Sequence, residues 1–403
     1  MSSEYPEGRS RYYHHLLRQG SSEVIDQMKP NHPHAHPHHA HDHTSGQDVP
    51  PLRLIAWELT RNCNLSCVHC RAAATRGPYD NELTTEECKG IIDDIAAHAQ
   101  PVMIMTGGEP LLRGDIFELA SYGTDKGLRM VMATNGTLIT PEVAGKMVAA
   151  GIKRISISID GATAGSHDKF RQVEGAFKGS LQGIEEAKKA GLEFQVNTTI
   201  TGINLKELPA IQELTVSLGA VAHHIFLLVP TGRGKDLADQ ALSAGEYEET
   251  LNWFYDQRDK VPLHLKATCA PHYYRILRQR AKAEGKEVTF QSHGLDAVTR
   301  GCLGGVGFCF VSHRGDVQPC GYLEINCGSV REMPLSRIWK ESPAFLNLRN
   351  PKMYKGKCGV CEYHRFCGGC RARAHEMSGD YLAEEPLCTY QPLKLRAPAK
   401  EGH

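Results

Sequence analysis

Between residues 52 and 230 the sequence alternates short apolar stretches with amphipathic ones, and this alternation restricts the fold more than any other feature. The apolar stretches have the length and residue content of strands, and the segments between them have helical periodicity. The six expected strands lie within residues 52–59, 101–108, 128–136, 152–161, 192–200 and 222–230. Apolar strands separated by helices indicate a parallel sheet with both faces covered. We therefore predict an α/β fold with a partial (β/α)6, TIM-like barrel over residues 51–260, whose reacting groups lie at the carboxyl ends of the strands.

The segments on either side of this region differ in composition. Residues 1–50 are poor in apolar side chains and hold seven histidines between His32 and His43. We predict a disordered, His-rich leader there, with loose transition-metal binding by its imidazoles as the alternative. After residue 260 the alternation stops and cysteine, glycine and turn residues dominate. We expect a linker and helix over 261–299, a small Cys-rich domain held together by metal over 300–392, and a tail over 393–403.

Charge and hydropathy exclude two classes of protein. Lys+Arg and Asp+Glu number 46 each, so no bulk charge attracts nucleic acid. No run of about 18 apolar residues is present, so we expect no membrane span. The first residues lack the apolar core of a signal peptide, which makes the cytoplasm the expected compartment. Disulfides are rare there, so the fourteen cysteines, twelve of them clustered, indicate metal or redox chemistry.

Cys63, Cys67 and Cys70 follow the first expected strand at the spacing C-x3-C-x2-C. Three thiolates on one loop can bind three irons of a [4Fe–4S] cubane and leave the fourth iron without a protein ligand. A zinc site would need a fourth ligand, for which His69 is the neighbouring candidate. The position of the motif directly after the first strand favours the open-iron cluster.

A C-x3-C-x2-C loop after the first strand of a (β/α) barrel resembles the signature of the radical S-adenosylmethionine (SAM) superfamily. The resemblance implies an enzyme in which the open iron chelates the amino and carboxylate groups of SAM and a 5′-deoxyadenosyl radical is generated. TGGEP at 106–110 resembles the glycine-rich segment of this family that contacts the methionine end of SAM. The SAM-binding candidates that the resemblance implies are Gly107, Gly108, Glu109, Asn135, Ser158 and Asp160.

The C-terminal cysteines resemble the SPASM extension of radical SAM enzymes, which carries auxiliary [4Fe–4S] clusters. Gly315 and Cys320 fit its G-x4-C element, but C-x2-C-x5-C-x2-C over 358–370 places its last cysteine one residue early. The family pattern assigns one cluster to Cys302, Cys309, Cys320 and Cys370 and the other to Cys358, Cys361, Cys367 and Cys388. Cys327 could substitute for Cys309, and two four-thiolate zinc sites are the alternative filling. Cys88 and Cys269, which stand apart, are expected to be small buried side chains.

Several segments, among them AWELTRNCNLSCVHCRA, HIFLLVPTGRG and TRGCLGGVGFCF, resemble the heme b synthases of the siroheme-dependent heme pathway over roughly residues 52–392. The resemblance implies oxidative decarboxylation of two propionates of iron-coproporphyrin III to vinyl groups. An auxiliary cluster would accept or relay the surplus electron, and a ferredoxin or flavodoxin would donate electrons. Arg71 and Arg233 are the candidate residues for the substrate carboxylates. A conceivable ligand of the porphyrin iron is His223, His224 or His272. Adjacent residues of a strand point to opposite faces, so only one of His223 and His224 can face the barrel interior.

Three other functions remain open on the sequence alone. A related enzyme could act on another tetrapyrrole, by removing acetate side chains from didecarboxysiroheme or by making heme-d-type precursors. A peptide-modifying relative often has a peptide-recognition domain, and none is evident before residue 51. A metal-storage or electron-transfer protein is the alternative outside the enzymes, for which a six-stranded barrel with an open-iron loop is excessive.

Overall fold

The computed structural model describes residues 49–396. The predicted His-rich leader, up to residue 48, and the last residues of the predicted tail lie outside this range. The first six strands are β1 (Leu54–Thr60), β2 (Val102–Gly107), β3 (Arg129–Thr134), β4 (Ile155–Ser158), β5 (Phe194–Ile200) and β6 (Ala222–Leu227). They pair in parallel in chain order, which confirms the predicted parallel sheet.

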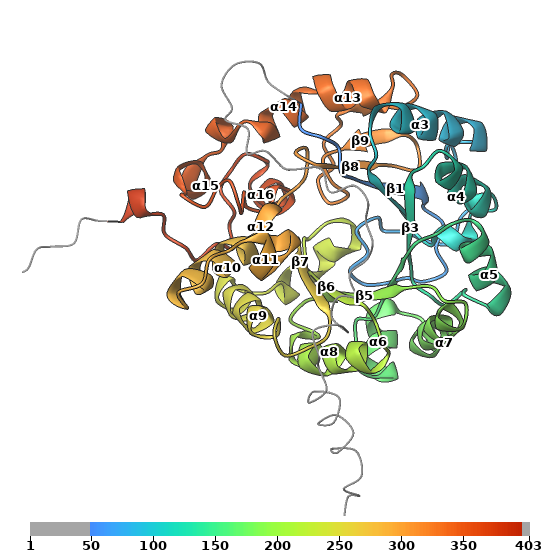
Figure 1. Cartoon of the computed structure of the whole chain (residues 1–403), viewed down its shortest axis with the longest axis horizontal. Helices are drawn as coiled ribbons and strands as arrows, with labels where there is room; N and C mark the ends of the chain where they lie inside the picture. Colours follow the sequence, from blue (N-terminus) through green and yellow to red (C-terminus); the bar gives the residue numbers. More distant parts are fainter. Residues whose placement is uncertain (1–48, 397–403) are drawn as a thin grey trace, which may run out of the picture. The chain divides into compact units, whose positions relative to one another are not determined.

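The connections between these strands are helical. They are α3 (Thr85–His98), α4 (Ile116–Asp125), α5 (Pro141–Ala149), α6 (Ala164–Arg171), α7 (Ala176–Lys189) and α8 (Leu208–Ser217). Capping residues explain where several of them begin: Thr84 and Glu87 form a reciprocal capping box before α3. Thr140 caps α5 and is followed by Pro141, a residue that suits the first helical turn. Figure 1 shows the helices on the outer side of a curved sheet.

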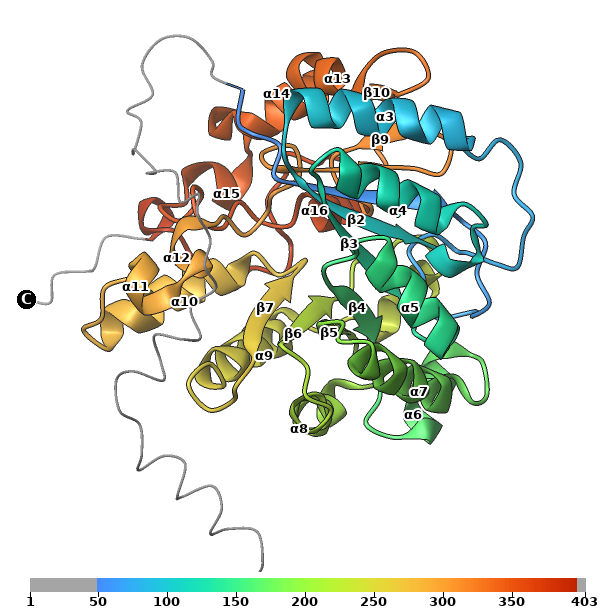
Figure 2. The ribbon, with the colours of Figure 1, turned by 45° about the vertical axis from the view of Figure 1, so that its right-hand side comes forward.

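The sheet continues beyond the six predicted strands at both edges. After α9 (Ala244–Asp256), β7 (His264–Thr268) pairs in parallel with β6, where the sequence predicted only a linker and a helix. Figure 2 shows β7 as the continuation of the series β4 to β6. At the other edge, β8 (Phe308–Val311) pairs in parallel with β1 and carries the antiparallel β9 (Asp316–Gln318) and β10 (Gly328–Ser329). The cysteine-rich region is therefore joined to the barrel through the first strand.

Helices account for most of the remaining regular structure. They are α10 (His272–Ala283), α11 (Phe290–His293), α12 (Leu295–Val298), α13 (Leu335–Glu341), α14 (Pro343–Arg349), α15 (Gly356–Val360) and α16 (Arg371–Ser378). Within residues 49–396 no helix combines the length and the apolar character needed to cross a membrane.

Burial alternates along the barrel strands. Outward-facing residues such as Ile55, Met103, Ile157 and Ile225 are at most 1% exposed, because the helices cover them. Their neighbours on the inner face are mostly half-buried. The hydrophobic core thus lies between sheet and helices, and the inner face remains partly accessible.

Candidate active site and cysteine groups

The three cysteines of the C-x3-C-x2-C motif lie on the loop after β1. The backbone N–H of Cys70 donates to the Cys67 carbonyl at 3.2 Å. The N–H groups of Leu65 and Ala74 donate to the sulfurs of Cys63 and Cys70, both at 3.4 Å. Burial raises the pKa of Cys63 to about 12. Such a thiol becomes a thiolate when a bound metal compensates its charge, so this loop suits a metal cluster.

The carboxyl end of α6 packs against this loop and brings a positive charge to it. The Arg171 carbonyl accepts from the Ser66 N–H at 3.3 Å. The Arg171 side chain is largely buried. Its Nη1 donates to the Cys67 sulfur at 3.4 Å, and its Nη2 pairs with Asp160. A buried guanidinium beside thiolates offsets part of their negative charge.

Arg233, one of the two predicted substrate residues, also contacts the loop. Its Nε donates to the Cys67 carbonyl at 2.8 Å and its Nη1 to the Ala74 carbonyl at 2.7 Å. Gly232 precedes it with φ of 54°, and a Cβ there would lie 2.4 Å from the Cys70 carbonyl oxygen. Arg233 therefore stabilises the conformation of the cysteine loop.

Gly107 and Gly108 lie where the end of β2 meets the start of the loop. A Cβ on Gly107 would be 2.4 Å from the Thr60 carbonyl oxygen, and one on Gly108 2.5 Å from that of Asn62. The N–H of Gly108 donates to Thr60 and that of Glu109 to Asn62, both at 2.8 Å. Only glycine permits this approach, which aligns TGGEP with the cysteine loop.

Glu109 and Asn135 connect the end of β3 to the cysteine loop. The fully buried Glu109 carboxylate accepts from the Thr134 hydroxyl at 2.7 Å and the Asn135 N–H at 2.8 Å. Burial outweighs these hydrogen bonds and raises the pKa of Glu109 to about 7. The Asn135 side chain donates to Asn64, within the cysteine loop, at 2.8 Å.

Asp160 follows β4 and is also buried. It accepts from the Thr199 N–H at 2.7 Å and lies 3.7 Å from His69 Nε2. Gly108, Glu109, Asn135 and Asp160 thus contact the loop directly or through Arg171. Gly107 pairs with Thr60 at the end of β1, and Ser158 lies half-buried on the inner face of β4. A glycine cradle and buried carboxylates beside three thiols suit a [4Fe–4S] cluster with SAM.

Arg71, the other predicted substrate residue, pairs with a buried carboxylate. Its Nη2 lies 3.1 Å from Glu58 Oε2, and its guanidinium stacks over the Phe310 ring at 4.5 Å. His313, in the turn after β8, lies 2.8 Å from the other oxygen of Glu58. Burial would raise the pKa of Glu58, but Arg71, His313 and Arg61 together lower it to about 2. This cluster joins β1 to the cysteine-rich region.

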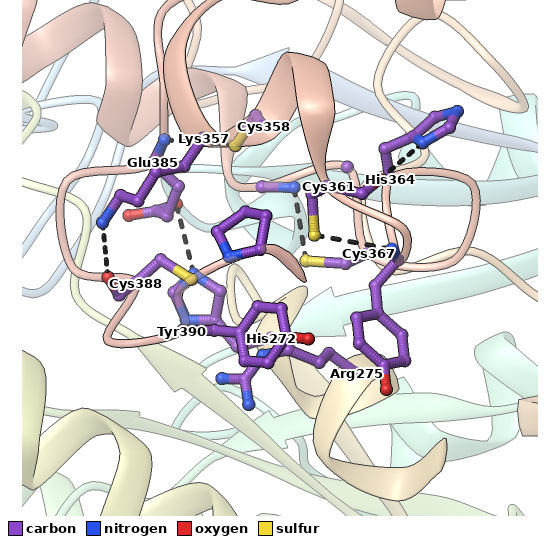
Figure 3. A pocket seen from close by; sticks show the side chains of 14 residues that line it. His272, Arg275, Lys357, Cys358, Cys361, His364, Cys367, Glu385, Cys388 and Tyr390 are labelled. Carbon is purple, nitrogen blue, oxygen red and sulfur yellow. Dashed lines mark hydrogen bonds and ion pairs between the residues drawn. The ribbon is translucent and has the colours of Figure 1, made fainter. Parts of the chain in front are cut away.

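Cys358, Cys361, Cys367 and Cys388, the residues of the second predicted cluster, line one pocket (Figure 3). The Tyr363 N–H donates to Cys361 and the Gly369 N–H to Cys367, both at 3.4 Å. The buried Arg371 donates to the Cys358 sulfur at 3.4 Å. Donors to sulfur stabilise thiolates and tune the potential of a cluster that they hold. We name these four residues the outer group.

A second set of thiols gathers beside the end of β7, and its membership differs from the family pattern. Cys269 and Cys320 pack in one cluster with the buried Cys370, and Cys302 is a further neighbour whose thiol affects that of Cys269. The Cys269 thiol is buried, and burial followed by these neighbours raises its pKa. We name Cys269, Cys302, Cys320 and Cys370 the inner group. Its shifted member, Cys370, is separated from Cys367 of the outer group by Gly368 and Gly369, whose φ angles of 78° and 62° lie in the left-handed region that favours glycine.

Cys309, which the family pattern placed with Cys302, is not brought to that set. It lies on β8 opposite Ile55 of β1 and is fully buried in the main core. The charges that act on its thiol are those of Cys327 and Arg349. Strand pairing with β1 explains this position, and Cys327 lies with it in the core. Cys269, which the sequence predicted to be an isolated buried side chain, belongs instead to the inner group.

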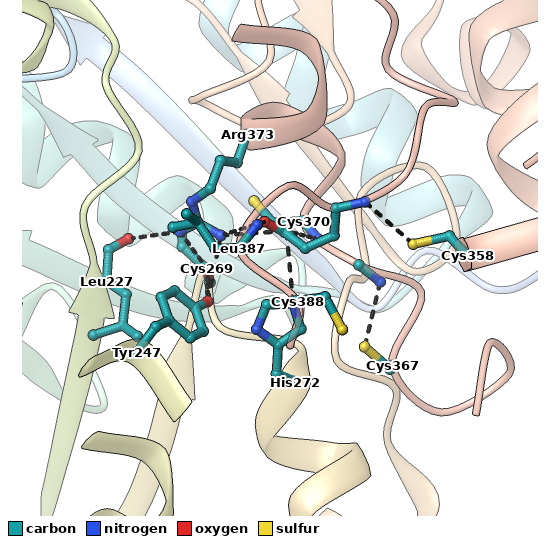
Figure 4. A network of polar contacts seen from close by, with 12 residues as sticks. Leu227, Tyr247, Cys269, His272, Cys358, Cys367, Cys370, Arg373, Leu387 and Cys388 are labelled. Carbon is teal, nitrogen blue, oxygen red and sulfur yellow. Dashed lines mark hydrogen bonds and ion pairs between the residues drawn. The ribbon is translucent and has the colours of Figure 1, made fainter. Parts of the chain in front are cut away.

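One acidic residue contacts both groups. The carboxylate of Glu385, fully buried, accepts from the Cys370 N–H at 2.7 Å, and its own N–H donates to the Cys358 sulfur at 3.3 Å. Arg373 Nη1 lies 3.3 Å from Glu385, and its Nη2 donates to the Cys269 carbonyl at 3.0 Å (Figure 4). Sequence reasoning missed Arg171, Cys269, Arg373 and Glu385, since nothing in their local sequence marks them.

Two regions of the chain match known protein families. Residues 57–215 match the radical SAM superfamily, and residues 302–370 match SPASM, an iron–sulfur cluster-binding domain. The crystal structure of Streptococcus suis SuiB bound to S-adenosylmethionine has the same fold, with a TM-score of 0.66 at 15% identity, covering 85% of this chain and 78% of that one.

Curated relatives share far more of the sequence. The AdoMet-dependent heme synthase of Nitratidesulfovibrio vulgaris is 58% identical, covering 90% of this chain and 98% of the relative. The protein of the same name from Methanosarcina barkeri is 56% identical, covering 85% and 97%. The Fe-coproporphyrin III synthase of that organism is 34% identical, covering 83% and 87%. The predicted enzyme class and cofactors, iron–sulfur clusters and SAM, are confirmed, and the chain belongs to the radical SAM family of AdoMet-dependent heme synthases.

Proposed function

We propose that this enzyme converts iron-coproporphyrin III into heme b by oxidative decarboxylation of two propionates to vinyl groups. The observation that carries this proposal is the 58% identity to a heme synthase over nearly the whole of both chains. Identity falls to 34% for a relative named for the synthesis of Fe-coproporphyrin III. The drop favours the use of iron-coproporphyrin III over its formation.

The proposed decarboxylation determines which cofactors the chain must bind. When bound, the cluster and SAM would supply a 5′-deoxyadenosyl radical able to remove a hydrogen atom from the propionate carbon next to the ring. Each propionate then loses one hydrogen atom, one CO2 and one electron in becoming a vinyl group. Cys63, Cys67 and Cys70 would hold the SAM-binding cluster, with Arg171 offsetting their charge. The surplus electron needs an acceptor, and the inner and outer groups provide thiols for two further clusters.

For the auxiliary clusters we propose that the inner group, with Cys269 in place of Cys309, holds one and the outer group the other. The grouping of Cys269 with Cys302, Cys320 and Cys370 supports this partition. Iron and sulfide content of Cys269→Ala and Cys309→Ala tests it. We expect Cys269→Ala to lose about a third of the iron of a three-cluster enzyme and Cys309→Ala to keep it. The reverse result would restore Cys309 as the ligand.

Anaerobic incubation with SAM, a reductant and iron-coproporphyrin III tests the reaction itself. We expect heme, CO2 and 5′-deoxyadenosine to appear together, with about one SAM consumed per propionate. Cleavage of SAM with unchanged porphyrin would refute the substrate and leave the enzyme class intact.

A further inference from the structure

Four polar side chains lie in one row across the inner face of the barrel. Ser158 pairs with Asn197, Asn197 with His224, and His224 with Lys266, on strands β4 to β7. Residues opposite one another in paired strands point to the same face of the sheet. Three strand spacings, roughly 14 Å, separate the two ends of this row.

The row faces the inside of the barrel. His223, adjacent to His224 and therefore on the other face, packs its ring against Phe254 of α9, with ring centroids 6.3 Å apart. Ser158, His224 and Lys266 are each half-buried, whereas the flanking strand residues are buried under the helices. These three side chains therefore keep part of their surface accessible on the inner face.

Lys266 has no acidic partner there. Among the described residues, no carboxylate lies within 4.0 Å of its ammonium group and no hydrogen bond to it is formed. The carboxylate whose charge acts on it is Asp296, which is paired with Arg258 at 3.0 Å. Burial lowers the pKa of Lys266, as expected where the surroundings leave a cation poorly solvated. A half-buried ammonium group without a partner favours an anionic ligand.

His224 adds a second donor beside Lys266. Its Nδ1 lies 2.9 Å from the Gln195 amide nitrogen, and that nitrogen is also 3.0 Å from Asn197 Oδ1. An amide N–H facing Nδ1 makes Nδ1 the acceptor, so the neutral ring carries its proton on Nε2. That N–H has no partner within residues 49–396 and is free to donate.

We propose that Lys266, assisted by His224, binds a propionate carboxylate of the tetrapyrrole inside the barrel. This inference rests on the proposed function. Arg71 and Arg233, the cations that the sequence suggested for this role, are occupied by Glu58 and by loop carbonyls. Because Lys266 lies three strands away from β4, which is followed by Asp160 beside the cysteine loop, it anchors a propionate other than the one that reacts near SAM. Lys266 is thus a positioning residue that sets how the macrocycle enters.

Binding of iron-coproporphyrin III to the cluster-loaded enzyme, followed through its Soret band without SAM or reductant, tests the proposal. We expect Lys266→Met to raise Kd at least about tenfold, the loss of one charge-assisted contact, and Lys266→Arg to restore part of it. Lys153→Met, which removes an exposed lysine, should bind like the wild type. The tetramethyl ester of the same porphyrin, which has no carboxylate, should bind wild type and Lys266→Met equally. Iron content and SAM binding of each variant report whether the fold is intact.

The outcomes separate the two proposals. If the wild type binds the tetracarboxylate and Lys266→Met binds it equally well, the role of Lys266 is overturned and the proposed function stands. If Lys266→Met weakens acid and ester alike, the residue supports the barrel rather than a carboxylate, which also overturns the inference. If the wild type itself does not bind iron-coproporphyrin III, the proposed function fails and the inference with it.

Discussion

Cys63, Cys67 and Cys70 lie on one loop of eight residues, whereas the inner and outer groups draw their thiols from five separate segments between residues 269 and 388. The loop is held by β2, β3 and α6, which bring a glycine cradle, an amide and a guanidinium to it. The inner and outer groups are held chiefly by buried charges, above all Glu385 and Arg373.

The difference separates two tasks. A short loop supplies three thiols and leaves the cradle beside them open to SAM, as a catalytic cluster needs. Groups of four thiols from distant segments suit closed clusters, whose task is to exchange electrons. The predictions below perturb the cysteine loop, the inner and outer groups, or the link between β1 and the cysteine-rich region.

Cys63→Ala should have the largest effect. Removing one of three thiolates leaves the loop unable to hold its cluster, so both 5′-deoxyadenosine and heme should fall to the detection limit. The inner and outer groups are untouched, and the variant should keep about two thirds of the wild-type iron. Iron analysis with product chromatography checks this, and persistent SAM cleavage would contradict it.

Glu385→Gln tests the charge that joins the two groups. It leaves the buried Arg373 without its counter-charge, which should cost about 3 kcal/mol of stability and lower the midpoint of anaerobic chemical denaturation. The matched control, Asp380→Asn, breaks the exposed pair with Lys355 and should cost less than about 1 kcal/mol. Equal effects of the two variants would show that burial of the Glu385 pair does not matter.

Arg171→Gln tests the cation beside the cysteine loop. Losing a positive charge near Cys67 makes the cluster harder to reduce, so its midpoint potential should fall and SAM cleavage should slow about tenfold. Arg171→Lys, which keeps the charge, should recover most of the potential. Electron paramagnetic resonance during a redox titration measures both, and an unchanged potential in Arg171→Gln would refute this role.

The smallest expected effect is the acid sensitivity of the link between β1 and the cysteine-rich region. Because the pKa of Glu58 is lowered to about 2 from an ordinary 4.5, its contribution is complete above pH 4.5 and is lost as the pH falls toward 2. At pH 4 the loss should be about 1 kcal/mol. Glu58→Gln should lack this component when the two proteins are compared by denaturation at pH 6 and pH 4. Parallel pH dependence would exclude it.

The sequence predicted the elements and sites that depend on residues close together in the chain. Periodicity located β1 to β6 and their helices, and spacing located the cysteine loop and the outer group. The sequence pattern missed β7, because a five-residue strand is defined by its pairing with β6. The pattern also misplaced Cys309, because the pairing of β8 with β1 joins segments about 250 residues apart. Arg171 and Lys266 gain their roles from neighbours that are distant in sequence, which no single-sequence pattern records.

The central claim is that the cysteine loop generates the radical while the outer group serves the removal of the electron. Cys358→Ala combined with Cys361→Ala tests it most directly, with 5′-deoxyadenosine and vinyl groups measured in the same anaerobic reaction. We predict that the variant retains part of the SAM cleavage and makes no vinyl group, so that the two products become uncoupled. Heme formation at the wild-type rate would contradict the account.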